Sequence, residues 1–223
     1  MKKLLVASVA VAALLGAPAF AADYPVKAAP AAAFNWSGFY IGGNGGYAWD
    51  GDTALNFLAV GVHTPFSPKG DLAGGQIGFN VQRGPWVLGA EITGDWSGVK
   101  AQNIAPVAVT VTTKLQDLET VTGRLGYAFN NVLFYGKAGG AWGSVKDSFA
   151  PGGVFLGATT NRRNGYVAGG GIEYGLTPNI ILGVEYDYIR FSNQSGLLVT
   201  GITPFNSTDF TLQSVLGRVS YKF

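Results

Sequence analysis

Along most of the chain, apolar residues occupy every second position and polar residues fill the positions between them. In the final stretch, one face carries the apolar residues and glycine, namely Val215, Gly217, Val219, Tyr221 and Phe223. The opposite face carries Arg218, Ser220 and Lys222. A period of two with one apolar face predicts a half-buried β-strand. A strand that is apolar on one side and charged on the other suits a wall between lipid and a polar lumen.

The same alternation recurs through the chain and predicts eight strands. We place them at Phe39–Trp49, Leu72–Gln82, Trp86–Trp96, Leu115–Phe129, Val132–Val145, Gly165–Leu176, Ile180–Phe191 and Thr208–Phe223. An even number of strands is what single-chain bacterial membrane barrels contain. The predicted fold is therefore all-β, an eight-stranded antiparallel up-and-down transmembrane β-barrel.

The connections between these strands alternate between short and long. Three are tight turns, at 83–85, 130–131 and 177–179, whereas the four near 50–71, 97–114, 146–164 and 192–207 are much longer. Short periplasmic turns and long outer loops are typical of outer-membrane barrels. With eight strands, both termini lie on the short-turn side, so we expect both in the periplasm of a Gram-negative cell.

Aromatic residues stand near the ends of the apolar faces. We expect them to form two interfacial girdles, made of Trp86, Trp96, Phe134, Trp142, Tyr166, Tyr174 and Tyr221. Such belts mark the two interfaces of a membrane barrel. The competing structure is a soluble lipocalin-like barrel, which would bury its apolar face and expose its charges. The sparse charges among many glycines favour a narrow charged interior instead.

The opposite faces of the strands carry charges of both signs. We expect a network in the lumen made of Glu91, Asp95, Arg124, Lys137, Glu173, Glu185, Asp187 and Arg218. Turning Arg or Lys to lipid at the bilayer midplane costs about 2–4 kcal/mol, which sets the register. We expect the pairs Glu91–Arg124, Lys137–Glu173 and Arg218–Glu185. The alternative is that each side chain is solvated separately by lumen water.

Two features of the last strand do not fit the simplest pattern. Phe210 and Leu212 lie on the opposite phase from Phe223, which suggests a bulge near Gln213 or a segment above the membrane. Leu216 is an apolar residue at a position that should face the polar lumen.

Composition places the chain in a secreted, cysteine-free class. Lys2 and Lys3 precede an apolar segment and an Ala19-Phe20-Ala21 cleavage site, so we expect a signal peptide at 1–21 rather than a membrane anchor. An Ala- and Pro-rich periplasmic leader at 22–35 and a barrel at 36–223 follow. Without the signal peptide, 15 Lys and Arg minus two leave 13, against 13 Asp and Glu. This balance predicts no nucleic-acid partner.

The residues needed for enzymatic chemistry are scarce. His63, in the first long loop, is the only histidine of the chain, and cysteine is absent. A catalytic or metal site needs partners that converge on such a residue. The run Gly169-Gly170-Gly171 lacks the Lys of a phosphate loop. We therefore expect no enzyme, no catalytic or metal site and no cofactor.

Several segments are similar to one known family. They are Trp36–Gly42, Thr120–Tyr127, Leu133–Gly140, Val184–Tyr188 and Phe223. They resemble the small outer-membrane β-barrel proteins of alphaproteobacteria, typified by the major outer-membrane proteins of Brucella and their rhizobial relatives. The resemblance implies residence in the outer membrane, roles at the envelope or cell surface, and Phe223 as the signal read by the barrel-assembly machinery. Thr122 stands where relatives often carry a second Arg, so a strongly basic lumen is not implied.

These patterns lead to one expected function and two alternatives. We expect a structural and surface barrel that contacts outer-membrane lipid and lipopolysaccharide and supports envelope integrity, with a possible surface ligand at the long loops. The first alternative is a narrow porin-like channel. The second is binding of haem or another ligand by the outer loops, with His63 as the haem ligand. Side chains from eight strands are expected to fill the lumen, which disfavours a channel.

Overall fold

The computed structural model describes residues 34–50, 53–57, 62–105, 109–151, 157–192, 195–197, 204–207 and 210–223. The expected signal peptide and most of the expected leader lie outside these ranges. Within them, no helix is long and apolar enough to cross a membrane.

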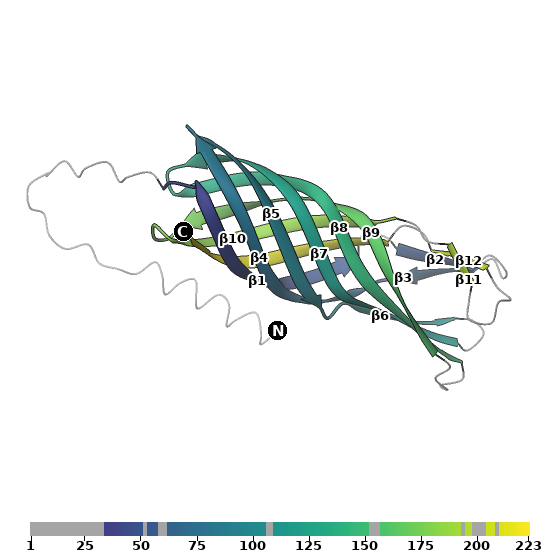
Figure 1. Ribbon diagram of the computed structural model, residues 1–223. Coiled ribbons are helices and arrows are strands. Elements are labelled where there is room, and N and C mark those ends of the chain that lie inside the picture. Colours follow the sequence, from purple (N-terminus) through teal and green to yellow (C-terminus); the bar gives the residue numbers. More distant parts are fainter. Residues whose placement is uncertain are drawn as a thin grey trace, which may run out of the picture. The chain divides into compact units, whose positions relative to one another are not determined.

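Eight long strands form one closed antiparallel sheet (Figure 1). They are β1 (Gly38–Asp50), β4 (Lys69–Arg83), β5 (Trp86–Ser97), β7 (Val109–Phe129), β8 (Val132–Pro151), β9 (Gly157–Gly175), β10 (Ile180–Phe191) and β13 (Phe210–Lys222). Each pairs with its neighbour in the chain, and β1 pairs with both β4 and β13, which closes the barrel. The predicted eight-stranded antiparallel barrel is therefore confirmed.

The strands end close to the predicted positions on the short-turn side and run further on the other side. The tight turns lie between Arg83 and Trp86, between Phe129 and Val132, and between Gly175 and Ile180. At the opposite end β7, β8 and β9 reach 21, 20 and 19 residues, well beyond the predicted segments. The C-terminus lies at the short-turn end (Figure 1), where the N–H of Phe223 donates to the carbonyl of Phe39.

The long connections contain further strands. β6 (Lys100–Ala105) follows β5 after a short break, pairs with β7 and touches β4 at one position. A second sheet joins β11 (Ser195–Leu197), β12 (Pro204–Ser207), β2 (Thr53–Phe57) and β3 (Val62–Phe66), in that order. His63 lies in β3, opposite Asn56 in the backbone register.

Of the two suggested explanations for Phe210 and Leu212, the bulge near Gln213 is wrong. β13 keeps an unbroken register with β10 from Phe210 to Tyr221, and with β1 from Leu212 to Lys222. Leu212, Ser214, Leu216 and Arg218 therefore share one inward phase, and the apolar residues among them are simply part of the interior. Within the described strands, a register shift lies instead in β7, between Leu115 and Asp117.

Candidate functional site in the barrel lumen

The two faces of each strand have opposite surroundings. In β5, Leu88 and Ile92 are 65% and 55% exposed, whereas Val87 and Glu91, each directly before one of them in the chain, are 1% and 2% exposed. In a membrane barrel, the exposed apolar face of a strand contacts lipid, and the buried face points into the lumen. The alternation read from the sequence thus assigns the inner and outer faces of β5 correctly.

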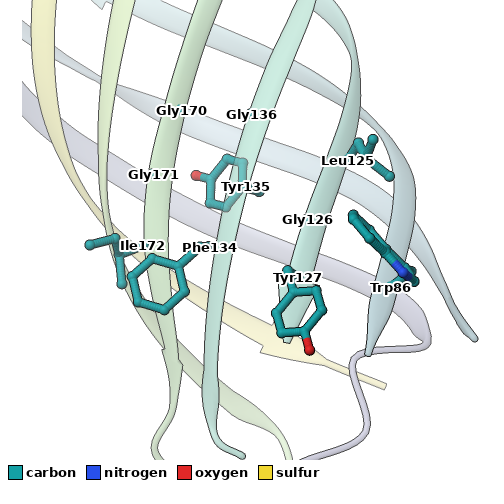
Figure 2. Close-up of a pocket in the computed structure, with 10 residues that line it drawn as sticks. All are labelled: Trp86, Leu125, Gly126, Tyr127, Phe134, Tyr135, Gly136, Gly170, Gly171 and Ile172. Carbon is teal, nitrogen blue, oxygen red and sulfur yellow. The ribbon is translucent and has the colours of Figure 1, made fainter. Parts of the chain in front are cut away.

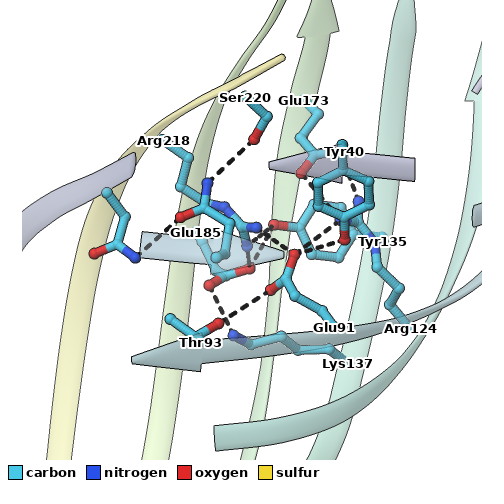
Figure 3. A network of polar contacts seen from close by, with 12 residues as sticks. Tyr40, Glu91, Thr93, Arg124, Tyr135, Lys137, Glu173, Glu185, Arg218 and Ser220 are labelled. Atoms are coloured by element: carbon cyan, nitrogen blue, oxygen red, sulfur yellow. Dashed lines mark hydrogen bonds and ion pairs between the residues drawn. The ribbon is translucent and has the colours of Figure 1, made fainter. Parts of the chain in front are cut away.

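Seven charged side chains form one alternating chain across the lumen. Each of its three cations contacts two carboxylates, and all seven side chains are buried. The order is Glu173, Arg124, Glu91, Arg218, Glu185, Lys137 and Asp187. Figure 3 labels all of them except Asp187. Such alternation offsets the large cost of taking charges out of water, because every charge has an opposite neighbour.

The Arg124 guanidinium is the second member of this chain and is held from several sides. Its Nη2 donates to Glu173 Oε2 at 2.6 Å and its Nη1 to Glu173 Oε1 at 3.2 Å, a bidentate pair. The same Nη1 lies 3.4 Å from Glu91 Oε2. The guanidinium also lies over the Tyr135 ring, 4.0 Å from its centroid. This arrangement uses both the hydrogen-bonding edge and the flat face of the arginine.

Two tyrosines complete the hydrogen bonds of the carboxylates. Tyr40 Oη donates to Glu91 Oε2 at 2.7 Å, and Tyr135 Oη donates to Glu185 Oε2 at 2.6 Å. Lys137 Nζ donates to the other oxygen, Glu185 Oε1, at 2.7 Å. Sequence reasoning missed these tyrosines as members of the network. Their inward phase was the available signal, because a buried tyrosine hydroxyl needs a polar partner.

Inward glycines make room for these contacts. Gly171 lies on β9 between Tyr135 of β8 and Glu185 of β10 in the register. A Cβ at Gly171 would lie 2.7 Å from Tyr135 Oη, so any larger residue would obstruct the path between them. Gly169 plays the same part between Lys137 and Asp187. Long side chains thus reach over a glycine to a strand beyond their neighbour.

This geometry changes one of the three predicted ion pairs. Glu91–Arg124 and Arg218–Glu185 are present. The prediction Lys137–Glu173 is wrong: Lys137 binds Glu185 and Asp187, at 2.7 and 3.1 Å, and Glu173 binds Arg124. The prediction assumed pairing between neighbouring strands, whereas the inward glycines of β9 direct Lys137 across that strand. Asp95 is buried in the lumen but belongs to none of the ion pairs within the described ranges.

An apolar layer fills the lumen on the long-strand side of the charged chain. It consists of Ala48, Leu72, Val99, Ala101, Leu115, Leu118, Ala141, Val145, Val167, Ile189, Phe191, Leu212 and Leu216. Leu212 and Phe191 have no exposed surface, and Leu216 is 2% exposed. The layer explains the apolar residue at position 216: it faces inward because this part of the lumen is a hydrophobic core.

A second apolar layer fills the short-turn end. Its members are Phe34, Trp36, Val87, Ala128, Leu133, Tyr135 and Ile181. Trp36 is fully buried, and its ring centroid lies 4.6 Å from that of Phe34. The sequence places Phe34 in the expected leader, whereas its side chain is 8% exposed and belongs to this layer. The segment before β1 therefore enters the lumen and covers the ionic chain from this end.

The residues expected to form girdles lie on the outer wall. Six of them are roughly half exposed or more, namely Trp86, Trp96, Phe134, Tyr166, Tyr174 and Tyr221. Trp142 is half-buried, because its ring lies over the outward glycine at position 140. Phe223 is 72% exposed, and its ring lies 5.2 Å from that of Tyr221. The assembly role of Phe223 and the interfacial role of the aromatic residues stay predictions.

Small residues interrupt this wall and leave a shallow recess of about 540 Å³ (Figure 2). Gly136 and Gly170, opposite each other on β8 and β9, form its floor, and Trp86, Tyr127 and Phe134 stand along one side. Its lining is mostly apolar and includes the outward side chains Trp86, Leu125 and Ile172, so the recess belongs to the lipid-facing surface. Among the described residues, no group of His, Cys, Asp and Glu could hold a metal ion.

An apolar outer wall around an ionic interior defines the class: a transmembrane β-barrel of the bacterial outer membrane. The chain belongs to the outer membrane protein beta-barrel domain family, whose model matches residues 7–223. It is 32% identical to the 31 kDa outer-membrane immunogenic protein of Brucella melitensis over the whole of both chains. It is 33% identical to the 22 kDa outer membrane protein of Rhizobium leguminosarum, over 81% of this chain and 74% of that one.

Solved structures support the fold alone. The outer membrane protein OprG from Pseudomonas aeruginosa superposes with a TM-score of 0.55 at 14% identity, over 84% of this chain and 96% of that one. The outer membrane protease OmpT from Escherichia coli superposes with a TM-score of 0.52 at 12% identity, over 83% and 97% of the chains. The relatives similar in sequence are named as outer-membrane proteins, whereas the protease is similar in fold only.

Proposed function

We propose that this protein is a sealed structural barrel of the outer membrane that presents its long-strand end at the cell surface. The observation that carries the proposal is the filled lumen. An ionic chain crosses the interior, and a closely packed apolar layer lies on each side of it. A conducting pore needs a continuous polar path, which the two apolar layers interrupt.

The ionic chain also suits a structural role. It connects side chains of β5, β7, β8, β9, β10 and β13, and Tyr40 adds β1. On the remaining strand, Gln76 accepts from Asn44 Nδ2 at 3.1 Å and donates to Ser220 Oγ at 3.1 Å. All eight strands are thus joined through the lumen as well as along the wall. Such cross-linking favours one rigid barrel shape.

Single-channel recording in planar bilayers tests the sealed lumen. Refolded protein should give no stable conductance step, while a general porin inserted by the same procedure gives one. Insertion is checked separately by flotation of the protein with liposomes. A reproducible step of defined size from protein that floats with the liposomes would favour the narrow porin.

The orientation is a further part of the proposal. Both ends of the described barrel lie on the short-turn side, so this side faces the periplasm if the chain follows the usual arrangement of outer-membrane barrels. Because the chain contains no cysteine, single Cys variants give an unambiguous readout. On intact cells, a membrane-impermeant maleimide should label Thr160→Cys in β9 and leave Asn130→Cys in a tight turn unlabelled. The reverse labelling pattern would contradict this orientation.

A further inference from the structure

Four lysines stand directly opposite one another across four adjacent strand segments. In the register Lys69 of β4 faces Lys100 of β6, Lys100 faces Lys114 of β7, and Lys114 faces Lys146 of β8. Residues paired across a sheet point to the same face. That face is the outer one, because the sequence neighbours Val99, Leu115 and Val145 are buried inside. We call these four residues the lysine row.

The register shift in β7 is what places Lys114 in this row. On the short-turn side of the shift, inward residues of β7 have even numbers, such as Leu118 and Arg124, and beyond it the inward residue is Leu115. Without the extra residue, Lys114 would share the inward phase of Leu118. Bulges often re-aim a side chain in this way. Here the bulge turns a fourth lysine to the outside, next to Lys100 and Lys146.

The row is not neutralised within the described part of the chain, where none of its four lysines forms an ion pair. Among the nearby carboxylates, exposed Asp71 lies two residues from Lys69 on the same face of β4 and forms no ion pair with it, and two others are engaged elsewhere. Asp117 Oδ1 accepts from the N–H of Ser144 at 3.0 Å, and Glu119 pairs with Arg162. Like charges directly opposite one another destabilise a sheet. An external anion that contacts several lysines would reverse this effect.

The row lies just beyond the aromatic end of the apolar wall. Lys100 and Lys146 each follow an outward tryptophan, Trp96 and Trp142, by four residues, which is about 13 Å along a strand. Lys69 lies opposite Trp49 in the register. Aromatic residues mark the interface of a bilayer, so cations one step beyond them lie at the depth of lipid headgroups.

We propose that the lysine row is a binding site for the phosphate groups of a membrane glycolipid, that is, of lipopolysaccharide in the outer leaflet. The inference rests on the proposed orientation, which puts this end of the barrel at the cell surface. Lysine ammonium groups bind phosphate as point charges without fixed geometry. The four lysines lie on four adjacent strand segments, so they are spread along the wall. The row therefore fits a lipid with more than one phosphate better than it fits a single free anion.

The test compares binding of purified, refolded protein to three probes in detergent at physiological salt. They are lipopolysaccharide, the same lipopolysaccharide after enzymatic dephosphorylation, and inorganic phosphate. A lysine close to an anionic lipid surface contributes about a fivefold gain in affinity. The variant K69Q/K100Q/K114Q/K146Q should therefore bind intact lipopolysaccharide at least about 30-fold more weakly, which corresponds to the loss of two such contacts.

Two control variants separate this site from general charge effects. The variant with Arg at all four positions keeps the charge and should bind like the original chain. Arg83→Gln removes an exposed cation at the short-turn end and should leave binding unchanged. The expected preference for intact over dephosphorylated lipopolysaccharide should disappear in the Gln variant.

Several results would overturn the proposal. One is equal affinity of the original chain for intact and dephosphorylated lipopolysaccharide. Another is full affinity of the Gln variant, once its heat-modifiable gel mobility shows that it is folded. Saturable binding of inorganic phosphate that abolishes lipopolysaccharide binding at equal concentration would assign the row to a free anion instead. These binding measurements do not depend on the conductance or cell-labelling experiments that test the proposed function. Failure of the proposed function is therefore recognised separately from failure of the lysine row.

Discussion

Arg124 and Glu173 form a bidentate ion pair although the whole of β8 lies between their strands. Arg124 is on β7, and its direct register partner on β8 is Lys137, a residue of the same charge. The guanidinium therefore turns across the Tyr135 ring and reaches β9, where Nη2 lies 2.6 Å from Glu173 Oε2. The barrel interior is held together by contacts that skip a strand, which a flat sheet could not form as easily.

Replacing Arg124 by Ala should destabilise the barrel strongly. Both partners of Arg124 are buried, and removing one member of a buried ion pair typically costs about 3–5 kcal/mol, because the other charge stays without a partner. We expect the heat-induced mobility shift on a semi-native gel to occur at a clearly lower temperature. Equilibrium unfolding by urea in lipid vesicles gives the free energy of unfolding.

The matched control for this variant is Arg162→Ala. Arg162 also pairs with a carboxylate, Glu119, but the two side chains are 59% and 52% exposed. An exposed pair contributes at most about 1 kcal/mol. Equal stability losses for the two variants would contradict a special role of the buried chain and would favour separate solvation of the lumen charges.

A pair of double-mutant cycles should distinguish the observed partner of Lys137 from the one expected from sequence. The changes are Lys137→Met with Glu185→Gln in one cycle, and Lys137→Met with Glu173→Gln in the other. Residues in direct contact couple by about 0.5–3 kcal/mol, and members of one ion-pair network can also couple indirectly. The free energies of unfolding should show the larger coupling in the first cycle, because Lys137 contacts Glu185 directly and reaches Glu173 only through the other members of the chain. Stronger coupling to Glu173 than to Glu185 would contradict the geometry.

The fold could be predicted because it follows from the alternation of apolar and polar residues, which is a local pattern of the sequence. Each residue of β5 shows its face through its neighbours, so strand positions, strand number and the lipid-facing side follow from the sequence. The pairing of charges depends on something else: which inward position on the intervening strand carries glycine, and how far each side chain reaches. Lys137 contacts Glu185 because Gly169 and Gly171 leave space, and that requires the register of three strands at once.

The apolar layers of the lumen and the lysine row could not be predicted from the sequence, because both depend on the register of several strands. Leu216 looks misplaced in a polar interior, and only the three-dimensional grouping with Leu212 and Phe191 shows an apolar layer. Lys114 has the wrong phase for an outward residue unless the register shift after Leu115 is known. Sequence periodicity assumes an uninterrupted strand, so one inserted residue changes the face of everything beyond it.

Adding one methyl group at Gly171 should show that the inward glycine space is used. A Cβ there would lie 2.6 Å from the carbonyl oxygen of Val184 and 2.7 Å from Tyr135 Oη. Overpacking of this kind typically costs about 1–3 kcal/mol. The control is Gly123→Ala on the outer wall, where a Cβ would meet nothing within 4 Å. That change should alter the free energy of unfolding by no more than about 0.5 kcal/mol. Similar effects of the two changes would indicate that Gly171 is not sterically constrained.

Tryptophan quenching should separate the lumen from the lipid-facing wall within one protein. Trp36 is fully buried, whereas Trp86 is 56% exposed on the outer face near the same end of the barrel. We expect vesicles of brominated lipid to quench most of the fluorescence of a variant that keeps only Trp86, with the other four tryptophans changed to Phe. A variant that keeps only Trp36 should retain its emission, because the barrel wall separates its indole from the acyl chains. The two residues lie near the same end of the barrel, so a difference between them reports the face rather than the depth. Equal quenching of both variants, or stronger quenching of Trp36, would contradict the inward position of the segment before β1 and with it the seal at this end of the lumen.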